Sequence, residues 1–129
     1  MNILGVDYGV KNIGLAWMQS GIDVVLPYGK IDASAGAEKA LGELSKLIKE
    51  EKIDKIVIGL PLGTDGSENK NTEKIRGFAD RLKNLVGDKI EFMNEAFTSQ
   101  QADRMGGKAS RDEKAAMIIL ETYKEKNIN

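Results

Sequence analysis

The sequence predicts an α/β protein in which a mixed β-sheet is flanked by helices. In the first third of the chain, short apolar runs rich in β-branched residues are separated by glycines, a pattern typical of an antiparallel meander. Beyond residue 34, segments with helical spacing of apolar residues alternate with short apolar runs, which is typical of strands joined by helices. Because the chain has 129 residues, we expect residues 1–129 to form one domain with its own core.

Three strands are expected in the meander. Residues of high β propensity cluster in the segments 2–8, 12–18 and 22–31. Gly9 and Gly21 separate these segments, and glycine is typical of the tight turns between antiparallel strands. We therefore expect two consecutive hairpins at the start of the chain.

Helices and strands are expected to alternate after the meander. Between residues 34 and 51, apolar residues recur at helical spacing among lysines and glutamates, which indicates an amphipathic helix. The run KIVIGL at residues 55–60 is nearly all apolar and precedes Pro61, as expected of a strand buried on both faces of a parallel sheet. A second helix is expected at 72–85 and another strand at 89–94, which brings the sheet to five strands, a three-strand meander plus two parallel strands.

The last part of the chain is expected to be helical. A short helix is predicted at 99–105, and the segment GGKAS follows it. Ser110 and Glu113 match the S-x-x-E capping box that begins a helix. The predicted order of elements is therefore βββαβαβαα.

The composition limits the chemistry that this chain can perform. Cysteine and histidine are both absent, which excludes disulfides, thiolate nucleophiles and the usual zinc ligands. A metal site would have to use oxygen ligands, so Mg²⁺ or Mn²⁺ is the metal that we expect. The net charge is −1, so a surface that binds nucleic acid would have to be a local basic patch.

The N-terminus shows no targeting signal. Met1 and Asn2 lead directly into an apolar run without a basic flank or a cleavage site. The sequence contains no apolar run of about 18 residues that would suit a membrane span. We expect a cytoplasmic protein with no membrane segment.

Asp7 interrupts the strand-like run ILGVDYG. An ionised carboxylate in a buried strand is costly unless it is paired or coordinated, which indicates a functional role. Glu95 follows the run KIEFM and lies where a strand would deliver its last side chain to the sheet edge. A surface turn acid at Asp7 and a solvated strand-end acid at Glu95 remain alternative interpretations.

Asp112 lies in the first turn of the terminal helix. There an acid is stabilised by the helix dipole, by roughly 0.3 to 1 kcal/mol, and this effect alone would explain the residue. Its helical phase favours a further role, because positions 112, 116, 119, 120 and 123 share one face that is otherwise apolar. Three carboxylates from two strands and a helix would suit one or two divalent cations that activate water for phosphodiester hydrolysis.

Three motifs carry a resemblance to a known family. These are GVDYGVKNIGLAW at 5–17, IVIGLPLGTDGSE at 56–68 and DEKAAMIIL at 112–120. In this order they resemble the YqgF/RuvX family of bacteria, described as Holliday junction resolvases and as pre-16S rRNA nucleases. The resemblance implies a ribonuclease H-like fold, a divalent metal and an acidic triad of Asp7, Glu95 and Asp112. It also implies pre-16S rRNA or branched DNA as the substrate.

The third motif of that family differs in this chain. The family motif reads D-E-R before a hydroxyl-rich stretch, whereas this chain reads NEAFTSQ at residues 94–100. Glu95 is retained, while Asn94 and Ala96 replace the acid and the cation. An alternative function is therefore a catalytically weakened member that binds structured RNA or a protein partner.

Residues near the proposed triad are candidates for contact with nucleic acid. The loop after Pro61 bends at Gly63 and Gly66 and carries polar side chains that can bind phosphate or sugar. The expected contacts are Lys11, Pro61, Thr64, Ser67, Lys70, Lys74 and Arg111. A solvated turn and solvated helix faces are the alternatives for the loop and the cations.

Glycines and aromatic residues near Asp7 have two interpretations each. Gly9 and Gly14 either allow backbone or substrate to approach closely or are ordinary hairpin glycines. Tyr8 and Trp17 are expected to pack in the core or at its rim, with base stacking as the alternative.

A different enzyme class shares the opening motif. In actin-like ATPases and sugar kinases the first phosphate loop resembles DYGVKNIG, but those proteins need a second phosphate hairpin and an adenosine site, for which this chain has no room. Monomer and homodimer are both expected as possible oligomeric states. A homodimer would suit a resolvase, because a resolvase must cut two symmetric strands.

Overall fold

The computed structural model describes residues 1–9, 11–22, 24–61, 69–95 and 107–127. In these ranges the elements are β1 (Asn2–Tyr8), β2 (Asn12–Gln19), β3 (Val25–Asp32), α1 (Ala37–Glu50), β4 (Lys55–Pro61), α2 (Lys70–Val86), β5 (Ile90–Glu95) and α4 (Arg111–Asn127).

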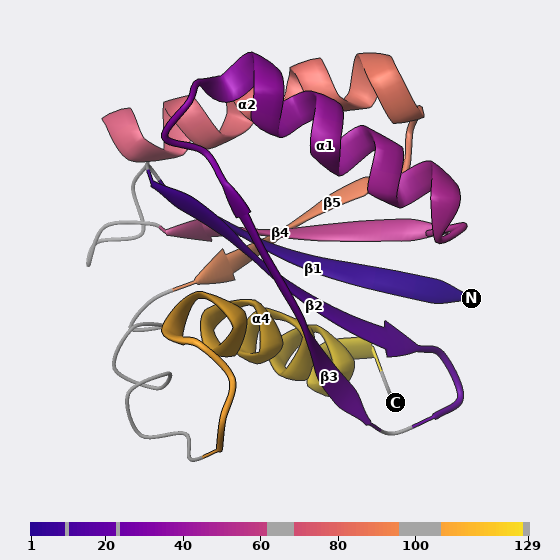
Figure 1. Ribbon diagram of the computed structural model, residues 1–129. Helices are drawn as coiled ribbons and strands as arrows, with labels where there is room; N and C mark the ends of the chain where they lie inside the picture. The colour runs from indigo at the N-terminus through magenta and orange to yellow at the C-terminus, as the bar shows by residue number, and fades with distance from the viewer. Residues whose placement is uncertain (10, 23, 62–68, 96–106, 128–129) are drawn as a thin grey trace.

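The strands form one five-stranded mixed sheet in the order β3-β2-β1-β4-β5. The β1–β2 and β2–β3 pairs are antiparallel, whereas β1–β4 and β4–β5 are parallel. Helices α1 and α2 cover one face of the sheet and α4 covers the other (Figure 1). The predicted meander with two added parallel strands is confirmed.

The core has two parts, one on each face of the sheet. Alternation along β1 directs Leu4 and Val6 toward α1 and α2, and Ile3 toward α4. Residues 56–60 of β4 are all buried, as predicted for a strand covered on both faces. These two apolar layers fix the sheet between the helices.

Several element boundaries differ from the prediction. β3 begins at Val25 rather than at residue 22, because Ile22 belongs to the β2–β3 turn, where its N–H donates to the Gln19 carbonyl at 3.1 Å. α1 begins at Ala37, after Gly36 with a φ of 116°, a conformation that does not continue a helix. The helix predicted at 99–105 lies outside the described residues.

α2 begins two residues earlier than the periodicity of apolar residues predicts. The Asn69 side chain accepts hydrogen bonds from the Asn71 and Thr72 N–H groups, at 2.9 and 3.2 Å. The Thr72 hydroxyl in turn accepts from the Asn69 N–H at 2.8 Å, which completes a capping box. The Asn69 side chain therefore caps the start of α2.

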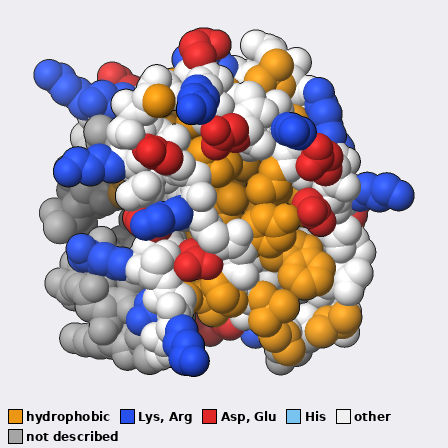
Figure 2. Space-filling model, in the orientation of Figure 1, with side chains coloured by type: hydrophobic (Ala, Val, Ile, Leu, Met, Phe, Trp, Pro, Cys, Tyr) orange, Lys and Arg blue, Asp and Glu red, His pale blue; other side chains and the backbone are white. Residues whose placement is uncertain are grey.

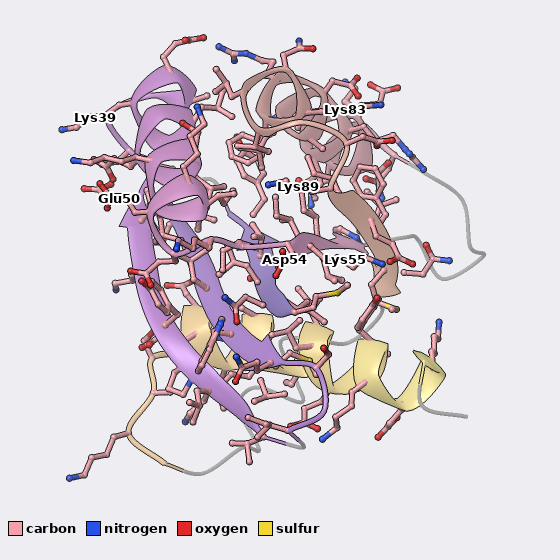
Figure 3. All side chains as sticks on the ribbon, turned by 90° about the vertical axis from the view of Figure 1, so that its right-hand side faces the viewer. Lys39, Glu50, Asp54, Lys55, Lys83 and Lys89 are labelled. Atoms are coloured by element: carbon pink, nitrogen blue, oxygen red, sulfur yellow. The ribbon has the colours of Figure 1, made fainter. Side chains whose placement is uncertain are left out.

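The amino-terminal edge of the parallel strands carries a polar network. Lys55 Nζ lies 3.1 Å from Glu91 Oε2 and donates to the Tyr123 hydroxyl at 3.2 Å. The Asn2 N–H donates to Asp54 at 2.7 Å. Figure 3 views the molecule from this edge, with α1 and α2 above the sheet and α4 below it. The candidate site described below lies at the opposite edge.

The surface over β3 is unusually apolar. Hydrophobic side chains gather over β3 and its turn with β2, and they include the exposed residues Ile22, Val24, Leu26 and Tyr28 (Figure 2). Beside them, Asn2, Trp17, Tyr28 and Glu51 line a hollow of about 210 Å³. Among the described residues, no helix combines the length and the apolar character needed to cross a membrane.

Candidate active site

Asp7 lies near the carboxyl end of β1. Alternation along the strand places it on the same face as Ile3, which packs toward α4. Its register partner in β2 is Gly14, and its side chain is half-buried. The carboxylate therefore points into the space between the sheet and the start of α4.

Gly14 allows the first turn of α4 to rest on the sheet. A Cβ atom at position 14 would lie 2.0 Å from the Asp112 carbonyl oxygen and 2.4 Å from its carbonyl carbon. Real Cβ atoms do not approach other atoms so closely, so only glycine fits here. The interpretation of Gly14 as a site of close backbone approach is confirmed. It is also confirmed for Gly9, whose N–H donates to the Asn12 carbonyl at 3.0 Å in the β1–β2 turn and where a Cβ atom would lie 2.5 Å from the same oxygen.

The two carboxylates at this point repel each other. Burial, and to a smaller extent the charge of Asp112, raises the pKa of Asp7 from 3.8 to about 6. Asp112 is half-buried and shares its face with the buried residues Ala116, Ile119, Leu120 and Tyr123, as its helical phase predicted. The fold thus holds two acids in a position that is costly without a counter-charge.

These residues fit a divalent cation. Their donors are carboxylate oxygens, which hard cations such as Mg²⁺ and Mn²⁺ prefer, and a cation would offset both the burial and the repulsion. Among the described side chains, no group of three or more acidic residues forms a ready metal site. The pair Asp7 and Asp112 could supply two ligands, and a third would have to come from another residue.

Glu95 is the last residue of β5. Its backbone pairs with Pro61 of β4, and β4 lies between β5 and β1 in the sheet. Because β1, β4 and β5 are parallel, their carboxyl ends meet at the same sheet edge, toward the left in Figure 1. The backbone of Glu95 therefore lies at the edge that carries Asp7, while its side chain lies outside the described residues.

Glu113 connects the start of α4 to the edge strand β3. It accepts hydrogen bonds from the Ser110 N–H at 3.0 Å and from the Gly29 N–H at 2.7 Å, and its own N–H donates to the Ser110 hydroxyl. The predicted capping box is confirmed. The pKa of Glu113 is lowered, chiefly by the hydrogen bond from the Ser110 N–H. The hydrogen bond from the Gly29 N–H and the charge of Lys30 make smaller contributions.

Some of the residues predicted to contact nucleic acid are described by the structure, and others are not. Lys11 is exposed after β1, Pro61 ends β4, Lys70 begins α2, and Arg111 begins α4. Lys74 is exposed one turn into α2. Thr64, Ser67 and Ala96 lie outside the described residues, and Asn94 is exposed near the end of β5.

Two residues at this site were not predicted from the sequence. Lys30 is the register partner of Gly14 in β3, so it lies in one row with Gly14 and Asp7 across three strands. The capping box indicated Glu113 but not its bond to Gly29, which is 84 residues away. No local signal could reveal either relation, because strand register creates the first and the packing of α4 against β3 creates the second.

Comparison with known proteins identifies the family. A family model described as "RuvX: Holliday junction resolvase" matches residues 1–126. A protein of Dictyoglomus turgidum named "Putative pre-16S rRNA nuclease" is 36% identical over 132 residues, which cover 95% of this chain and 93% of that protein. A protein of Aeromonas salmonicida with the same name is 37% identical over 133 residues, which cover 96% and 94%.

A solved structure shows the same fold. Thermus thermophilus RuvC in complex with a Holliday junction substrate superposes with a TM-score of 0.66 at 12% identity, and the match covers 99% of this chain and 97% of that one. The mixed sheet and the helices on its two faces define a ribonuclease H-like fold. The chain belongs to the RuvX family. The resemblance carried by its three motifs is thereby confirmed.

Proposed function

We propose that this chain is a divalent-metal-dependent endonuclease that hydrolyses phosphodiester bonds in structured nucleic acid. The observation that carries the proposal is the half-buried pair of Asp7 and Asp112, held together at the carboxyl edge of the sheet. Family membership supports the same class of activity.

Asp7 and Asp112 would hold Mg²⁺ or Mn²⁺, with Glu95 as the third ligand. When bound, the cation activates water and stabilises charge on the leaving oxygen. Gly14 gives α4 its close approach, and Glu113 holds the first turn of that helix against β3. These two residues keep the Asp112 carboxylate beside Asp7. The proposed contacts to nucleic acid are Lys11, Pro61, Thr64, Ser67, Lys70, Lys74 and Arg111.

The substrate that we propose is the 5′ end of pre-16S rRNA. Relatives with 36 and 37% identity carry that activity in their names, whereas the likeness to RuvC, at 12% identity, supports the fold alone. Resolution of Holliday junctions is the second substrate candidate, and the description of the family favours it.

Location and assembly follow from the choice of substrate. With pre-16S rRNA as its substrate, the protein would act in the cytoplasm, where bacterial rRNA is processed. A single cut needs one active site, so residues 1–129 could act as one domain in a monomer, whereas two symmetric cuts at a junction need a homodimer.

A second candidate function is binding without efficient cleavage. Asn94 and Ala96 stand where the family motif has an acid and a cation, so a contact beside Glu95 is missing. Such a member would bind structured RNA or a protein partner through the same edge of the sheet.

The first experiment compares the wild-type protein with Asp7→Asn. Each is incubated with an RNA that carries the 5′ leader of 16S rRNA and with a four-way DNA junction, in Mn²⁺, Mg²⁺ or chelator. Metal-dependent cutting by the wild type alone is expected, and the preferred substrate separates the two reactions. Binding by both proteins without cutting would favour the second candidate function.

A further inference from the structure

A second concave surface lies next to the candidate active site, on the other face of the sheet. It is a hollow of about 270 Å³ between the start of α1 and the middle of α2, lined by Tyr8, Ala37, Lys74, Gly77, Phe78 and Arg81. Tyr8 directly follows Asp7 in β1, so their side chains point to opposite faces at the same sheet edge. We call this surface the α1–α2 hollow.

The α1–α2 hollow combines aromatic and cationic groups. The Tyr8 ring stacks on Phe78 with 4.4 Å between the ring centroids, which confirms the expected rim packing of Tyr8. Lys74 and Arg81 line the hollow from α2, and Arg81 forms an ion pair with Glu38. A guanidinium has five N–H donors, so one carboxylate leaves donors of Arg81 for a ligand. Aromatic surface beside cations is the combination that binds single nucleic-acid strands.

Gly77 has no close neighbour among the described residues that would require a glycine. It lies in the interior of α2, where glycine is less favourable than alanine. A Cβ atom built at this position would meet no atom of the described part of the chain within 4 Å, so no contact there requires a glycine. In α2 it lies between Lys74 and Arg81, at positions that share one helical face. A missing side chain here leaves room for a ligand to approach the helix backbone.

We propose that the α1–α2 hollow binds the sugar-phosphate backbone of a nucleic-acid strand that extends from the Asp7–Asp112 pair around the edge of the sheet. The inference rests on the proposed function. Lys74 and Arg81 contact phosphates, Tyr8 contacts a sugar or base, and Gly77 allows the strand to lie against α2.

The decisive variant is Gly77→Ala, with Gly42→Ala as its matched control. Gly42 lies inside α1, and a Cβ atom there also meets nothing within 4 Å, but it does not line the hollow. Both variants should raise the melting temperature by about 2 to 4 °C, because alanine favours a helix. Only Gly77→Ala should weaken binding, about fivefold or more, since its methyl group overfills a close contact. Binding is measured by fluorescence anisotropy in chelator, with the labelled RNA of the cleavage experiment.

A second pair of variants tests the phosphate contact. Lys74→Gln should lower the slope of log affinity against log salt concentration by about 0.7, the value for one phosphate of a single strand. Lys83→Gln removes an exposed lysine near the end of the same helix, outside the hollow, and should leave the slope unchanged.

The outcomes separate this inference from the proposed function. Wild-type binding by Gly77→Ala together with an unchanged salt slope for Lys74→Gln would overturn the inference. If the wild type still cut the RNA with metal, the proposed function would stand. A wild-type protein that neither bound nor cut the nucleic acids would overturn both.

Discussion

The Asp7 carboxylate occupies an unfavourable position that the rest of strand β1 stabilises. Leu4 and Val6 anchor β1 in the core, so the strand forms whatever the charge of Asp7. The carboxylate is then held half-buried near Asp112, and its pKa rises to about 6. The apolar residues of the strand offset the unfavourable placement of the acid.

The raised pKa predicts how stability depends on pH without metal. Below pH 3.8 the folded and unfolded states both bind the Asp7 proton, and between pH 3.8 and about 6 only the folded state retains it. The free energy of unfolding therefore falls as pH rises through this window and stays lowered above it, by at most about 3 kcal/mol. Asp7→Asn should remove this dependence and be more stable than wild type at neutral pH.

Urea unfolding across pH 3.5 to 8 in chelator would measure this effect, at roughly half-unit steps. Asp80→Asn, which removes an exposed acid from α2, serves as the control and should follow the wild-type curve. A constant difference between Asp7→Asn and wild type at every pH would contradict the assigned pKa.

At the scale of elements, the contact between α4 and the sheet decides the geometry of the site. Gly14→Ala would place a methyl group on the Asp112 carbonyl, so α4 would have to move away from β2. We expect a loss of about 1 to 3 kcal/mol in the free energy of unfolding, as for other overpacked contacts. Chemical denaturation measures the loss, and Gly42→Ala, which meets no neighbour, should be at least as stable as wild type.

The hydrogen bonds of Glu113 give a second prediction at this scale. Glu113→Ala removes the acceptor for the N–H groups of Ser110 and Gly29, and should cost about 1 to 2 kcal/mol in the free energy of unfolding. Glu125→Ala, an exposed acid later in α4, should change stability by less than about 0.5 kcal/mol. Equal stability of the two variants would show that Glu113 does not hold α4 to β3.

At the scale of the whole molecule, the site joins distant parts of the chain. Asp7 lies in the first strand and Asp112 in the last described helix, and Glu95 ends β5 at the same edge. A cation bound there would connect β1, β5 and α4, so its binding should stabilise the complete fold.

Metal binding should therefore raise the melting temperature of the wild-type protein. At a Mn²⁺ concentration about 100 times the dissociation constant, the gain is about 2.7 kcal/mol. Asp7→Asn should lose this gain while keeping its fold, which thermal unfolding and circular dichroism with and without Mn²⁺ would show. An equal shift for Asp7→Asn would remove Asp7 from the ligand set.

Much of the fold follows from local patterns. The apolar run at 55–60, the capping box at Ser110 and the phase of Asp112 each depend on neighbours within a few residues, and the structure confirms them. The start of α2 was placed too late because the Asn69–Thr72 capping box precedes the periodic apolar residues. Glu95 as a metal ligand stays a prediction.

The class of fold, the family and the candidate acids could be predicted from the chain alone, because periodicity and motifs are local properties. Three contacts emerged only from the folded protein: Gly14 lies under Asp112, Glu113 binds Gly29, and Gly77 lines a hollow beside Tyr8. They arise because strand register and helix packing bring together residues that are far apart in the chain. Such contacts depend on how the whole core packs, and no short segment encodes them.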